Sequence, residues 1–468
     1  MSIPGLGLSA SVARTQLGPI DIIETIAVHE LSRNSEWRFE VAISQSIELK
    51  VLSGTAELFG TELALNHPYT FRGTKAAIYS WHGCRLEVKG LCTEYIAEET
   101  PMISYVNAHF ALEKSRDDAQ ESGGEGPRVL VLGPSNSGKT SLVKLLTAYA
   151  VRMGRQPMII NTDSREGLLS IPGILTATPF ASTLDVEEGW GSSPSSGPSP
   201  VPVKSPLCYY YGLENPEDNT RLWKPTVSRL AITATSRLVD DPDVKFTGMI
   251  IDTPGSITSG KYSFDLISHI VKEFQVNTIL ILGSERLEKE MTRQLQAYKT
   301  VRGEEVTVLK LDKSGGCVDR DETFMRATRD IAIKEYFFGT PSHTLSPQTR
   351  QISFSDLTIY RITSPTTISS NFLPGLGEEE TSFSCNIYEK TSAIDFGEML
   401  HSVLAVAYAR RGDAQETVRD APVMGFVYVA EVDARREKVS LLAPSSEDIG
   451  ERPLVWGCWP EAVLNLMG

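Results

Sequence analysis

The sequence predicts a mixed β and α/β chain: an N-terminal antiparallel β-sandwich, a central domain on a mainly parallel sheet, and a C-terminal α+β domain. Three observations predict this fold class. Apolar and polar residues alternate before residue 100, a strand–loop–helix–strand pattern spans residues 129–160, and strand and helix patterns mix after residue 340. The predicted boundaries are 1–115, 116–340 and 341–468, in line with the two or three domains expected of 468 residues.

Composition and charge exclude some classes of protein. The 59 acidic residues outnumber the 45 basic ones, and the net charge of −14 argues against a broad surface for non-specific nucleic-acid binding. Any RNA or DNA site would therefore be a local groove. The six cysteines lack CxxC spacing, so no zinc framework is expected. Because no apolar run approaches the ~20 residues of a membrane helix, we expect a soluble intracellular protein.

The N-terminal region is made of short alternating segments separated by glycine-containing turns, which is typical of a small antiparallel sandwich or barrel. The predicted strands are Trp37–Val41, Ile47–Val51, Ala56–Phe59, Ala76–Tyr79 and Leu86–Val88. A helical pattern follows at Tyr105–Arg116. The charged and glycine-rich segment Asp117–Gly126 is predicted to be a linker.

The central region predicts a βαβ unit. Val129–Leu132 and Met158–Ile160 are purely apolar strands, and Ser141–Val151 is a helix with one apolar face between them. Since such a unit makes its strands parallel, the later apolar strands extend a parallel sheet. They are predicted at Gly248–Ile251, Thr278–Leu282 and Val306–Leu309. The Gly-, Ser- and Pro-rich run at about 189–206 is predicted to be a disordered surface insertion.

The C-terminal region predicts a separate domain with little sign of its chemistry. Its strands are predicted at Leu357–Ile362 and Cys385–Tyr388, and then around Met424–Val432 and Lys438–Leu442. A long amphipathic helix is predicted at Ile394–Arg410, between the two pairs of strands. The order of these elements indicates an α+β domain.

The strongest motif is GPSNSGKT at Gly133–Thr140, which matches GxxxxGK[ST] directly between a strand and a helix. In such a loop the backbone N–H groups surround phosphate oxygens, the lysine reaches the outer phosphates, and the hydroxyl of the last residue binds magnesium. We therefore predict a site for a nucleoside triphosphate with Mg²⁺. The predicted ligands from this loop are Gly133, Asn136, Ser137, Gly138, Lys139, Thr140 and Ser141.

Switch GTPases, motor-type ATPases, and kinases of small molecules or polynucleotides all use this loop. Ile250–Gly255 resembles the DxxG of GTPases, but Leu309–Lys313 stands where a guanine-specific NKxD is expected, which disfavours a GTPase. Asp252 either helps to hold the metal or caps a turn. Asp163 follows the second strand, where it could accept a proton, hold a metal-bound water, or cap a turn.

Six motifs, in matching order along nearly the whole chain, resemble the eukaryotic Clp family. They are LFGTEL from Leu58, GPSNSGKT, LSIPG from Leu169, DVEEG from Asp185, LDKSGG from Leu311 and EYFFG from Glu335. This family includes polyribonucleotide 5′-hydroxyl kinases and subunits of the pre-mRNA cleavage and polyadenylation machinery. The resemblance, closest to fungal-type members, implies ATP as the nucleotide and the three-domain arrangement given above. It also implies that Glu36 and Lys75 of the N-terminal domain contact ATP.

The chain departs from the active kinases of that family at three places. Ser256 stands where those kinases carry a tryptophan that resembles an RNA-stacking platform, and such stacking is worth ~1–3 kcal/mol per base. Arg320 matches the first of two lid arginines, but Met325 stands at the second position, with Arg326 one residue later. A one-residue shift turns a helical side chain by ~100°, so Arg326 is not an obvious substitute. Arg165-Glu166 replaces a Gly-Gln pair.

Two functions compete on this basis. In the first, the chain is an ATP-binding scaffold subunit of the nuclear pre-mRNA 3′-end cleavage factor, with little or no turnover. In the second, it is a polyribonucleotide 5′-hydroxyl kinase in which Asp163 is the base, and Lys139, Arg320 and Mg²⁺ stabilise the transferring phosphoryl. Thr140, Asp163 and Asp252 are the predicted metal-site residues. We favour the scaffold, because the departures from the kinase pattern lie around the site of the RNA acceptor and the transferring phosphoryl, whereas the GPSNSGKT loop that would bind ATP is intact.

The resemblance also implies the partners of the chain. The main one is a cleavage-factor protein with a CTD-interacting domain, bound at the central and C-terminal domains. Other 3′-end processing subunits complete the complex, in which the chain would be a monomer. RNA is expected to bind only weakly or through the complex, and no membrane is expected.

Overall fold

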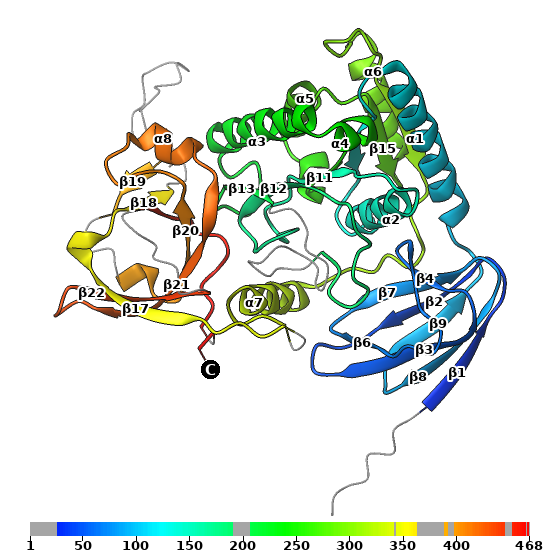
Figure 1. The fold of residues 1–468 in the computed structure, drawn as a ribbon, viewed down its shortest axis with the longest axis horizontal. Helices are drawn as coiled ribbons and strands as arrows, with labels where there is room; N and C mark the ends of the chain where they lie inside the picture. The colour runs from blue at the N-terminus through cyan, green and yellow to red at the C-terminus, as the bar shows by residue number, and fades with distance from the viewer. Residues whose placement is uncertain are drawn as a thin grey trace, which may run out of the picture.

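The computed structural model describes residues 26–190, 206–340, 343–362, 388–391, 397–444, 452–464 and 466–467. It contains an N-terminal β-sandwich, a central α/β part and a C-terminal β-rich part that lie side by side (Figure 1). The fold class predicted from the sequence is therefore confirmed. Among the described helices, none combines the length and the apolar character needed to cross a bilayer.

The N-terminal sandwich consists of two antiparallel sheets. One has the order β1-β8-β3-β6 and the other β5-β4-β7-β2-β9. Their bounds are β1 Ile26–Leu31, β2 Ser35–Glu40, β3 Ser46–Gly54, β4 Glu57–Leu58, β5 Thr61–Glu62, β6 Tyr69–Arg72, β7 Lys75–Ser80, β8 Cys84–Lys89 and β9 Thr93–Ala97. Alternate apolar side chains, among them Trp37, Leu49 and Leu86, fill the space between the sheets. The five predicted strands are present, and β1, β5, β6 and β9 are additional.

Helix α1, Met102–Ser122, is longer than the sequence predicted. The linker prediction for Asp117–Gly126 is therefore wrong over its first six residues, which are helical. Five of the six are exposed polar residues, which leaves no apolar pattern. Arg155, which follows the neighbouring helix, donates to Asp117 and Gln120. The helix ends at Gly123, whose φ of 68° is the left-handed conformation typical of a helix C-terminus.

The central sheet has the order β13-β12-β11-β14-β10-β15-β16. Its strands are β10 Arg128–Leu132, β11 Met158–Asn161, β12 Ile174–Pro179, β13 Leu207–Tyr210, β14 Met249–Asp252, β15 Thr278–Leu282 and β16 Thr307–Leu311. Strands β11, β14, β10, β15 and β16 are mutually parallel, whereas β12 pairs antiparallel with both β11 and β13. The mainly parallel sheet is thus confirmed, and β12 and β13 are additions.

Helices cover both faces of this sheet (Figure 1). They are α2 Lys139–Arg152, α3 Thr220–Asp240, α4 Pro242–Thr247, α5 Ser263–Phe274 and α6 Glu285–Leu295, whereas α7 Glu322–Phe338 lies between the sandwich and the C-terminal part. The first of them follows β10 directly, as predicted, so that the loop between them lies at the carboxyl ends of the parallel strands.

The insertion predicted at 189–206 lies mostly outside the described residues. At its start the prediction is wrong: Gly189 forms a bridge with Asp185, and Trp190 is 5% exposed and packs against Phe180. A large aromatic ring can bury its apolar surface even when it borders a Gly- and Ser-rich run.

The C-terminal part is a seven-stranded sheet of order β17-β22-β21-β20-β23-β18-β19 with one short helix, α8 Gln415–Asp420. The strands are β17 Gln348–Ser353, β18 Ile359–Ile362, β19 Tyr388–Lys390, β20 Val403–Ala407, β21 Val423–Asp433, β22 Lys438–Ala443 and β23 Leu454–Trp456. The predicted strand at Cys385–Tyr388 lies outside the described residues except for Tyr388.

The long helix predicted at Ile394–Arg410 is wrong. Residues 394–396 lie outside the described chain, a short 3₁₀ turn follows at 397–399, and Val403–Ala407 is the central strand β20. All five residues of that strand are buried between β21 and β23. A continuous apolar run that is buried on both faces carries no period that distinguishes a strand from a helix.

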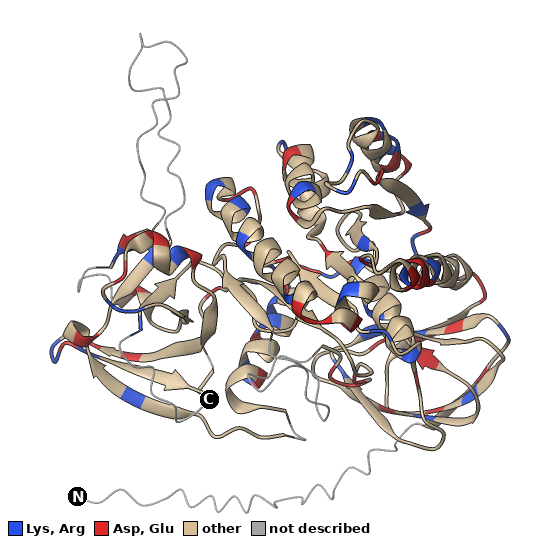
Figure 2. Ribbon diagram, turned by 45° about the horizontal axis from the view of Figure 1, so that its top comes forward, with Lys and Arg blue, Asp and Glu red and all other residues tan. Residues whose placement is uncertain are grey.

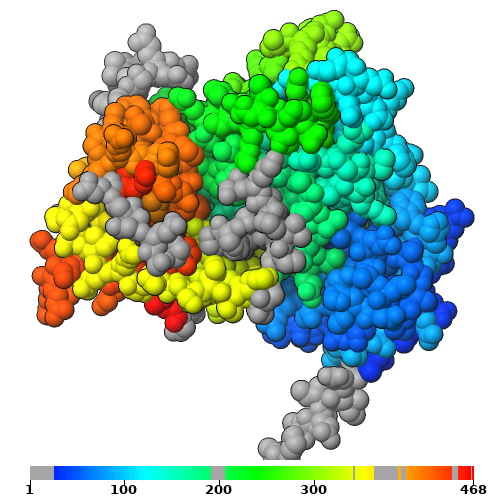
Figure 3. Space-filling model, in the orientation of Figure 1, coloured from blue at the N-terminus to red at the C-terminus, as the bar shows by residue number. Residues whose placement is uncertain are grey.

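Helix α7 connects all three parts of the molecule. Near its start, Phe324 lies 5.1 Å from the Lys75 ammonium of the sandwich. Near its end, the hydroxyl of Tyr336 accepts a hydrogen bond from the backbone of Phe426 in β21. In the space-filling view, yellow atoms of this segment and of β17 run from the C-terminal part to the blue sandwich (Figure 3).

Candidate nucleotide-binding site

The GPSNSGKT loop forms a cradle between β10 and α2. Asn136 and Gly138 adopt left-handed backbone conformations, with φ of 55° and 86°. A side chain at Gly133 would place its Cβ 2.7 Å from Ser137 Oγ, so glycine is required there. The buried Ser137 Oγ has no hydrogen-bond partner in the described chain. An unpaired buried hydroxyl beside this loop fits a site that a phosphate completes.

Three of the predicted residues line the inner end of the cradle. Lys139 is 7% exposed and donates from Nζ to the carbonyl of Pro134 at 2.9 Å. Burial lowers the pKa of Lys139, which the carboxylates of Asp252 and Asp163 partly offset. Thr140 Oγ1 donates to Asp252 Oδ2 at 2.6 Å. Ser141 lies half-buried in the first turn of α2.

Asp252 and Asp163 end neighbouring parallel strands, as their sequence positions predicted. Asp252 closes β14, and Asp163 follows β11, which pairs with it. Burial raises the pKa of Asp252 to about 6. Burial and, next, the carboxylate of Glu166 raise the pKa of Asp163 to about 7. Two buried carboxyl groups beside a hydroxyl suit a hard divalent cation, whose charge would favour their ionised forms.

The lid arginine Arg320 is held by Glu166. Its Nη1 and Nη2 donate to the two carboxylate oxygens at 2.9 and 2.5 Å, and its Nε lies 3.4 Å from Asn136 Oδ1. The guanidinium holds the pKa of Glu166 below its usual range in spite of burial. The sequence singled out both residues but did not predict that they pair.

The lid loop, residues 312–321 between β16 and α7, lies between the cradle and the sandwich. A Cβ at Gly138 would lie 2.9 Å from Cys317 Sγ, so the loop packs directly on the cradle. On its other side, the guanidinium of Arg38 in β2 packs against Gly315 and Gly316. Arg38 was not predicted, and its only signal in the sequence is a basic residue between the two apolar residues Trp37 and Phe39.

The two predicted contacts from the sandwich lie near the lid. Glu36 is 3% exposed and accepts from Arg38 Nε at 2.8 Å. Lys75 pairs with Glu40 at 3.0 Å, and its Nζ lies 3.4 Å from the carbonyl of Asp319. A cavity of about 280 Å³ opens beside Lys75 and Phe324. The structure therefore brings both residues to the lid rather than to the cradle itself.

The remaining lid positions face away from the cradle. Met325 is buried at 6% exposure. The Nε of Arg326 lies 4.0 Å from a carboxylate oxygen of Glu461 in the C-terminal part.

Ser256 packs beside Ser135 of the cradle through its neighbour Gly255, and its buried Oγ has no partner among the described residues. Lys144, one turn after Thr140, is a basic residue that the sequence analysis missed, and its Nζ lies over Gly189.

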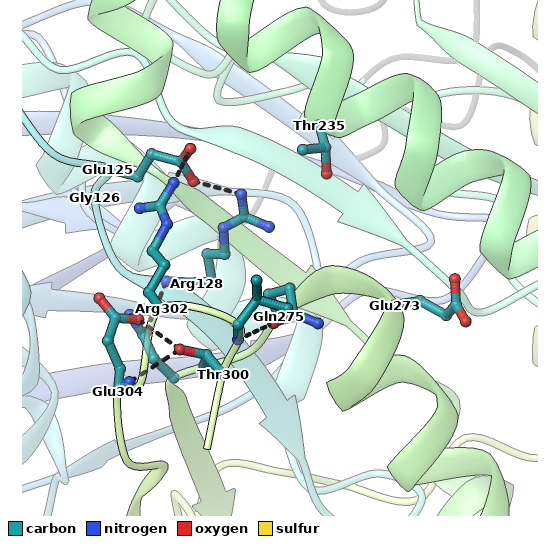
Figure 4. Close-up of a pocket in the computed structure, with 11 residues that line it drawn as sticks. Glu125, Gly126, Arg128, Thr235, Glu273, Gln275, Thr300, Arg302 and Glu304 are labelled. Atoms are coloured by element: carbon teal, nitrogen blue, oxygen red, sulfur yellow. Dashed lines mark hydrogen bonds and ion pairs between the residues drawn. The ribbon is translucent and has the colours of Figure 1, made fainter. Parts of the chain in front are cut away.

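A second cavity, of about 260 Å³, lies at the opposite end of the sheet, beneath the amino ends of β10 and β15 (Figure 4). The carboxylate of Glu125 forms ion pairs with the two arginines there, Arg128 and Arg302. In the view of Figure 2, acidic and basic residues of the described chain are interspersed. In the described chain, no group of three or more His, Cys, Asp or Glu side chains could hold a metal ion by itself.

Three family descriptions match consecutive parts of the chain. They are the N-terminal beta-sandwich domain of polyadenylation factor at residues 30–119, the mRNA cleavage and polyadenylation factor CLP1 P-loop at 133–339, and pre-mRNA cleavage complex II protein Clp1 at 345–461. The resemblance identified from the sequence motifs is thereby confirmed.

Relatives and solved structures match over nearly the full length. The mRNA cleavage and polyadenylation factor clp1 of Botryotinia fuckeliana is 62% identical over 468 residues, and that of Aspergillus clavatus is 42% identical, each with 100% of both chains covered. A solved Clp1p–Pcf11p complex has a TM-score of 0.81 at 28% identity and covers 93% of this chain and 98% of that one. A second structure, of the extended Pcf11p–Clp1p interface and of ATP loss in a point mutant, has the same TM-score and identity and covers 93% and 99%. The chain therefore belongs to the Clp1 family of mRNA cleavage and polyadenylation factors.

Proposed function

We propose that the chain is an ATP-binding scaffold subunit of the nuclear pre-mRNA 3′-end cleavage and polyadenylation factor, of the cleavage factor I type, and that it holds ATP with little or no turnover. The observation that carries this proposal is the two-point ion pair between Arg320 and Glu166 beside a complete cradle. The cradle can bind a triphosphate while the arginine needed for transfer is paired with a carboxylate.

The ligands proposed for ATP come from two domains. The residues at Gly133, Asn136, Ser137, Gly138, Lys139, Thr140 and Ser141 surround the phosphates, while Glu36 and Lys75 face the adenine side. The orphaned hydroxyl of Ser137 and the buried ammonium of Lys139 support phosphate binding. Both groups gain hydrogen-bond or charge partners when a phosphate binds.

The oxygen donors of Thr140, Asp252 and Asp163 fit Mg²⁺ bound together with the phosphates. The metal would supply charge neutralisation of the triphosphate. The residues do the rest: Thr140 and Asp252 fix each other through their 2.6 Å hydrogen bond, and Asp163 offers a carboxylate on the acceptor side.

The residues that would face the RNA 5′-hydroxyl, the acceptor of the phosphoryl group, argue for weak turnover. A transition-state arginine is worth ~10³–10⁵ in rate, and Arg320 here is neutralised by a carboxylate. Met325 is buried and Arg326 faces Glu461, so neither supplies a second arginine. Ser256 offers no aromatic surface on which a base could stack. We therefore propose that RNA binds only weakly or through the complex.

One observation favours the alternative, an active polyribonucleotide 5′-hydroxyl kinase. A pKa of about 7 for Asp163 suits a general base at neutral pH, with Lys139 and Arg320 stabilising the phosphoryl group. In that case Arg320 would have to exchange Glu166 for the γ-phosphate.

The proposed partner is a cleavage-factor protein with a CTD-interacting domain, like the Pcf11p of the solved Clp1p–Pcf11p complexes. We propose that it binds across the central and C-terminal parts, within a hetero-complex that contains one copy of this chain. The family's role in mRNA processing supports a nuclear location.

The test is to incubate purified protein with ATP, Mg²⁺ and a 5′-hydroxyl oligoribonucleotide, and to measure label on the RNA and ATP carried through purification. The expected result is ATP retained with no label transferred. Multiple turnovers would refute the scaffold and establish the kinase, whereas a preparation that binds no ATP would refute both.

A further inference from the structure

The C-terminal segment Gly457–Glu461 follows β23 and packs onto the loop that carries Asp163. Trp459 is 8% exposed, and its Nε1 donates to the backbone carbonyl of Ser164 at 3.1 Å. Its backbone N–H donates to the carbonyl of Gly212 at 3.0 Å. Because Ser164 follows Asp163 directly, a residue of the C-terminal part contacts the loop Asp163–Glu166, called the acceptor loop below.

A chain of ion pairs makes a second connection between the same two regions. The guanidinium of Arg329, in α7, lies 4.5 Å from the centre of the Trp459 ring and donates to Glu461 at 2.6 Å. It also donates to Glu322 at 2.7 Å, and Glu322 accepts from Arg165 at 2.8 Å. Arg329 is 2% and Glu461 27% exposed, so their pair is largely shielded from water, whereas Glu322 is 61% exposed and its pairs with Arg329 and Arg165 lie at the surface.

The acceptor loop, Asp163–Glu166, carries the groups that decide how the lid closes. Asp163 stands at its start, and Glu166 at its end holds Arg320 at two points. The backbone of this loop is held by Trp459 at Ser164, and the side chain of Arg165 pairs with Glu322. A shift of either contact would move Glu166 and, with it, the lid arginine.

We propose that Trp459 and Arg329 are positioning residues for the nucleotide site, through which the C-terminal segment holds the acceptor loop and sets how tightly the lid retains nucleotide. This inference rests on the proposed ATP-binding function. Thermodynamic linkage makes the effect reciprocal, so that bound nucleotide also stabilises the seated C-terminal segment. A partner that binds the C-terminal part would thereby act on nucleotide exchange.

The chain contains a matched control for this cluster. Arg361 lies 4.7 Å over the ring of Trp456 and pairs with Glu398 at 3.0 Å, which repeats the Trp–Arg–Glu arrangement of Trp459, Arg329 and Glu461. Trp456 packs in the apolar core of the C-terminal part rather than on the acceptor loop. Equal substitutions in the two clusters therefore separate positioning from general stability.

The experiment compares W459F with W456F in the full chain, loaded with a fluorescent ATP analogue and chased with excess unlabelled ATP. Phenylalanine keeps a ring beneath the arginine and removes the N–H donor. We expect W459F to release the analogue about three- to tenfold faster than the wild type, as fits one lost buried hydrogen bond. W456F should stay within about twofold. E461Q and E398Q form a second pair that is nearer the surface, with the same expectation.

Hydrogen exchange on the nucleotide-free protein gives a readout that does not depend on ATP. We expect faster amide exchange at residues 163–166 in W459F and not in W456F. Unchanged exchange in that loop, or equal release rates for W459F and W456F, would overturn the inference. A wild type that retains no analogue while W459F still loosens the loop would refute the ATP function and leave the positioning role standing.

Discussion

Glu166 and Arg320 form their two-point ion pair at the mouth of the cradle, where the charge of bound ATP would lie. The pair neutralises Arg320 in the nucleotide-free protein. When ATP binds, the carboxylate either shares the arginine with the phosphates or is left as a negative charge beside them. The first outcome leaves Arg320 less able to stabilise phosphoryl transfer, and the second places a negative charge beside the triphosphate, where like charges in a partly desolvated site repel.

Replacing this carboxylate by its neutral isostere tests that argument. We expect E166Q to bind ATP about tenfold more tightly, because removal of one negative charge near the triphosphate is worth ~1–2 kcal/mol at an effective dielectric constant near 20. Calorimetric titration at fixed ionic strength measures the change. E214Q is the control, since Glu214 pairs with Arg165 at 2.9 Å on the outer side of the loop. Weaker or unchanged ATP binding by E166Q would contradict the account.

Asp163 and Asp252 make the stability of the nucleotide-free protein depend on pH. Their pKa values of about 7 and about 6 lie above the ~4 of an exposed aspartate. Between pH 4 and 7 the folded state therefore binds more protons than the unfolded state, so the contribution of these groups to the stability of the fold falls as the pH rises. We expect the free energy of unfolding of the wild type, relative to D163N, to fall by roughly 1–3 kcal/mol from pH 5 to pH 7.5.

Urea denaturation at each pH measures this difference. D163N keeps an oxygen for the backbone N–H of Arg165, which the native carboxylate accepts at 2.9 Å, so the loop should stay formed. Parallel pH profiles for the two proteins would show that Asp163 does not carry the raised pKa.

At the scale of elements, the lid loop is held between the sandwich and the cradle by two glycines. A Cβ at Gly316 would lie 2.8 Å from Nε and 3.0 Å from Cδ of Arg38, closer than packed atoms normally approach. We expect G316A to displace Arg38, to cost about 1–2 kcal/mol of stability as overpacking does, and to speed ATP release. Thermal unfolding with and without ATP measures both effects.

G412A is the matched control for that substitution. A Cβ at Gly412 would meet no atom of the described chain within 4 Å, and its φ is not positive, so alanine fits there without strain. If G316A were as stable as G412A and retained ATP equally, the lid would not be clamped by Arg38.

The sequence predicts local elements well where their pattern is periodic, and it predicts the site where topology is simple. The strand and helix around GPSNSGKT are correct, and Asp163 and Asp252 meet Thr140 because parallel strands place their carboxyl ends together. By contrast, β20 is purely apolar, so it was mistaken for part of a helix. The partner of Arg320 lies 154 residues away, and no local pattern encodes such a contact.

At the scale of the whole molecule, the nucleotide site is assembled from every part of the chain. The sandwich contributes Arg38, the central domain the cradle, and the C-terminal segment Trp459. The domain boundaries 1–115, 116–340 and 341–468 stay a prediction, and helix α1 runs across the first of them. A ligand between parts stabilises the arrangement that it touches by RT ln(1 + [L]/Kd), ~2.7 kcal/mol at a hundredfold excess.

Removing the phosphate-binding ammonium tests whether ATP holds that arrangement for the partner. We expect K139A to lose bound ATP during purification and to weaken association with the CTD-interacting cleavage factor about tenfold or more, because the sandwich and the lid are then no longer clamped to the central domain. Pull-down and calorimetry with the purified partner measure this. K289A, on the exposed face of α6, should change neither property. Normal partner binding by nucleotide-free K139A would remove the clamp and leave ATP without a structural role, since the partner surface would then form without it.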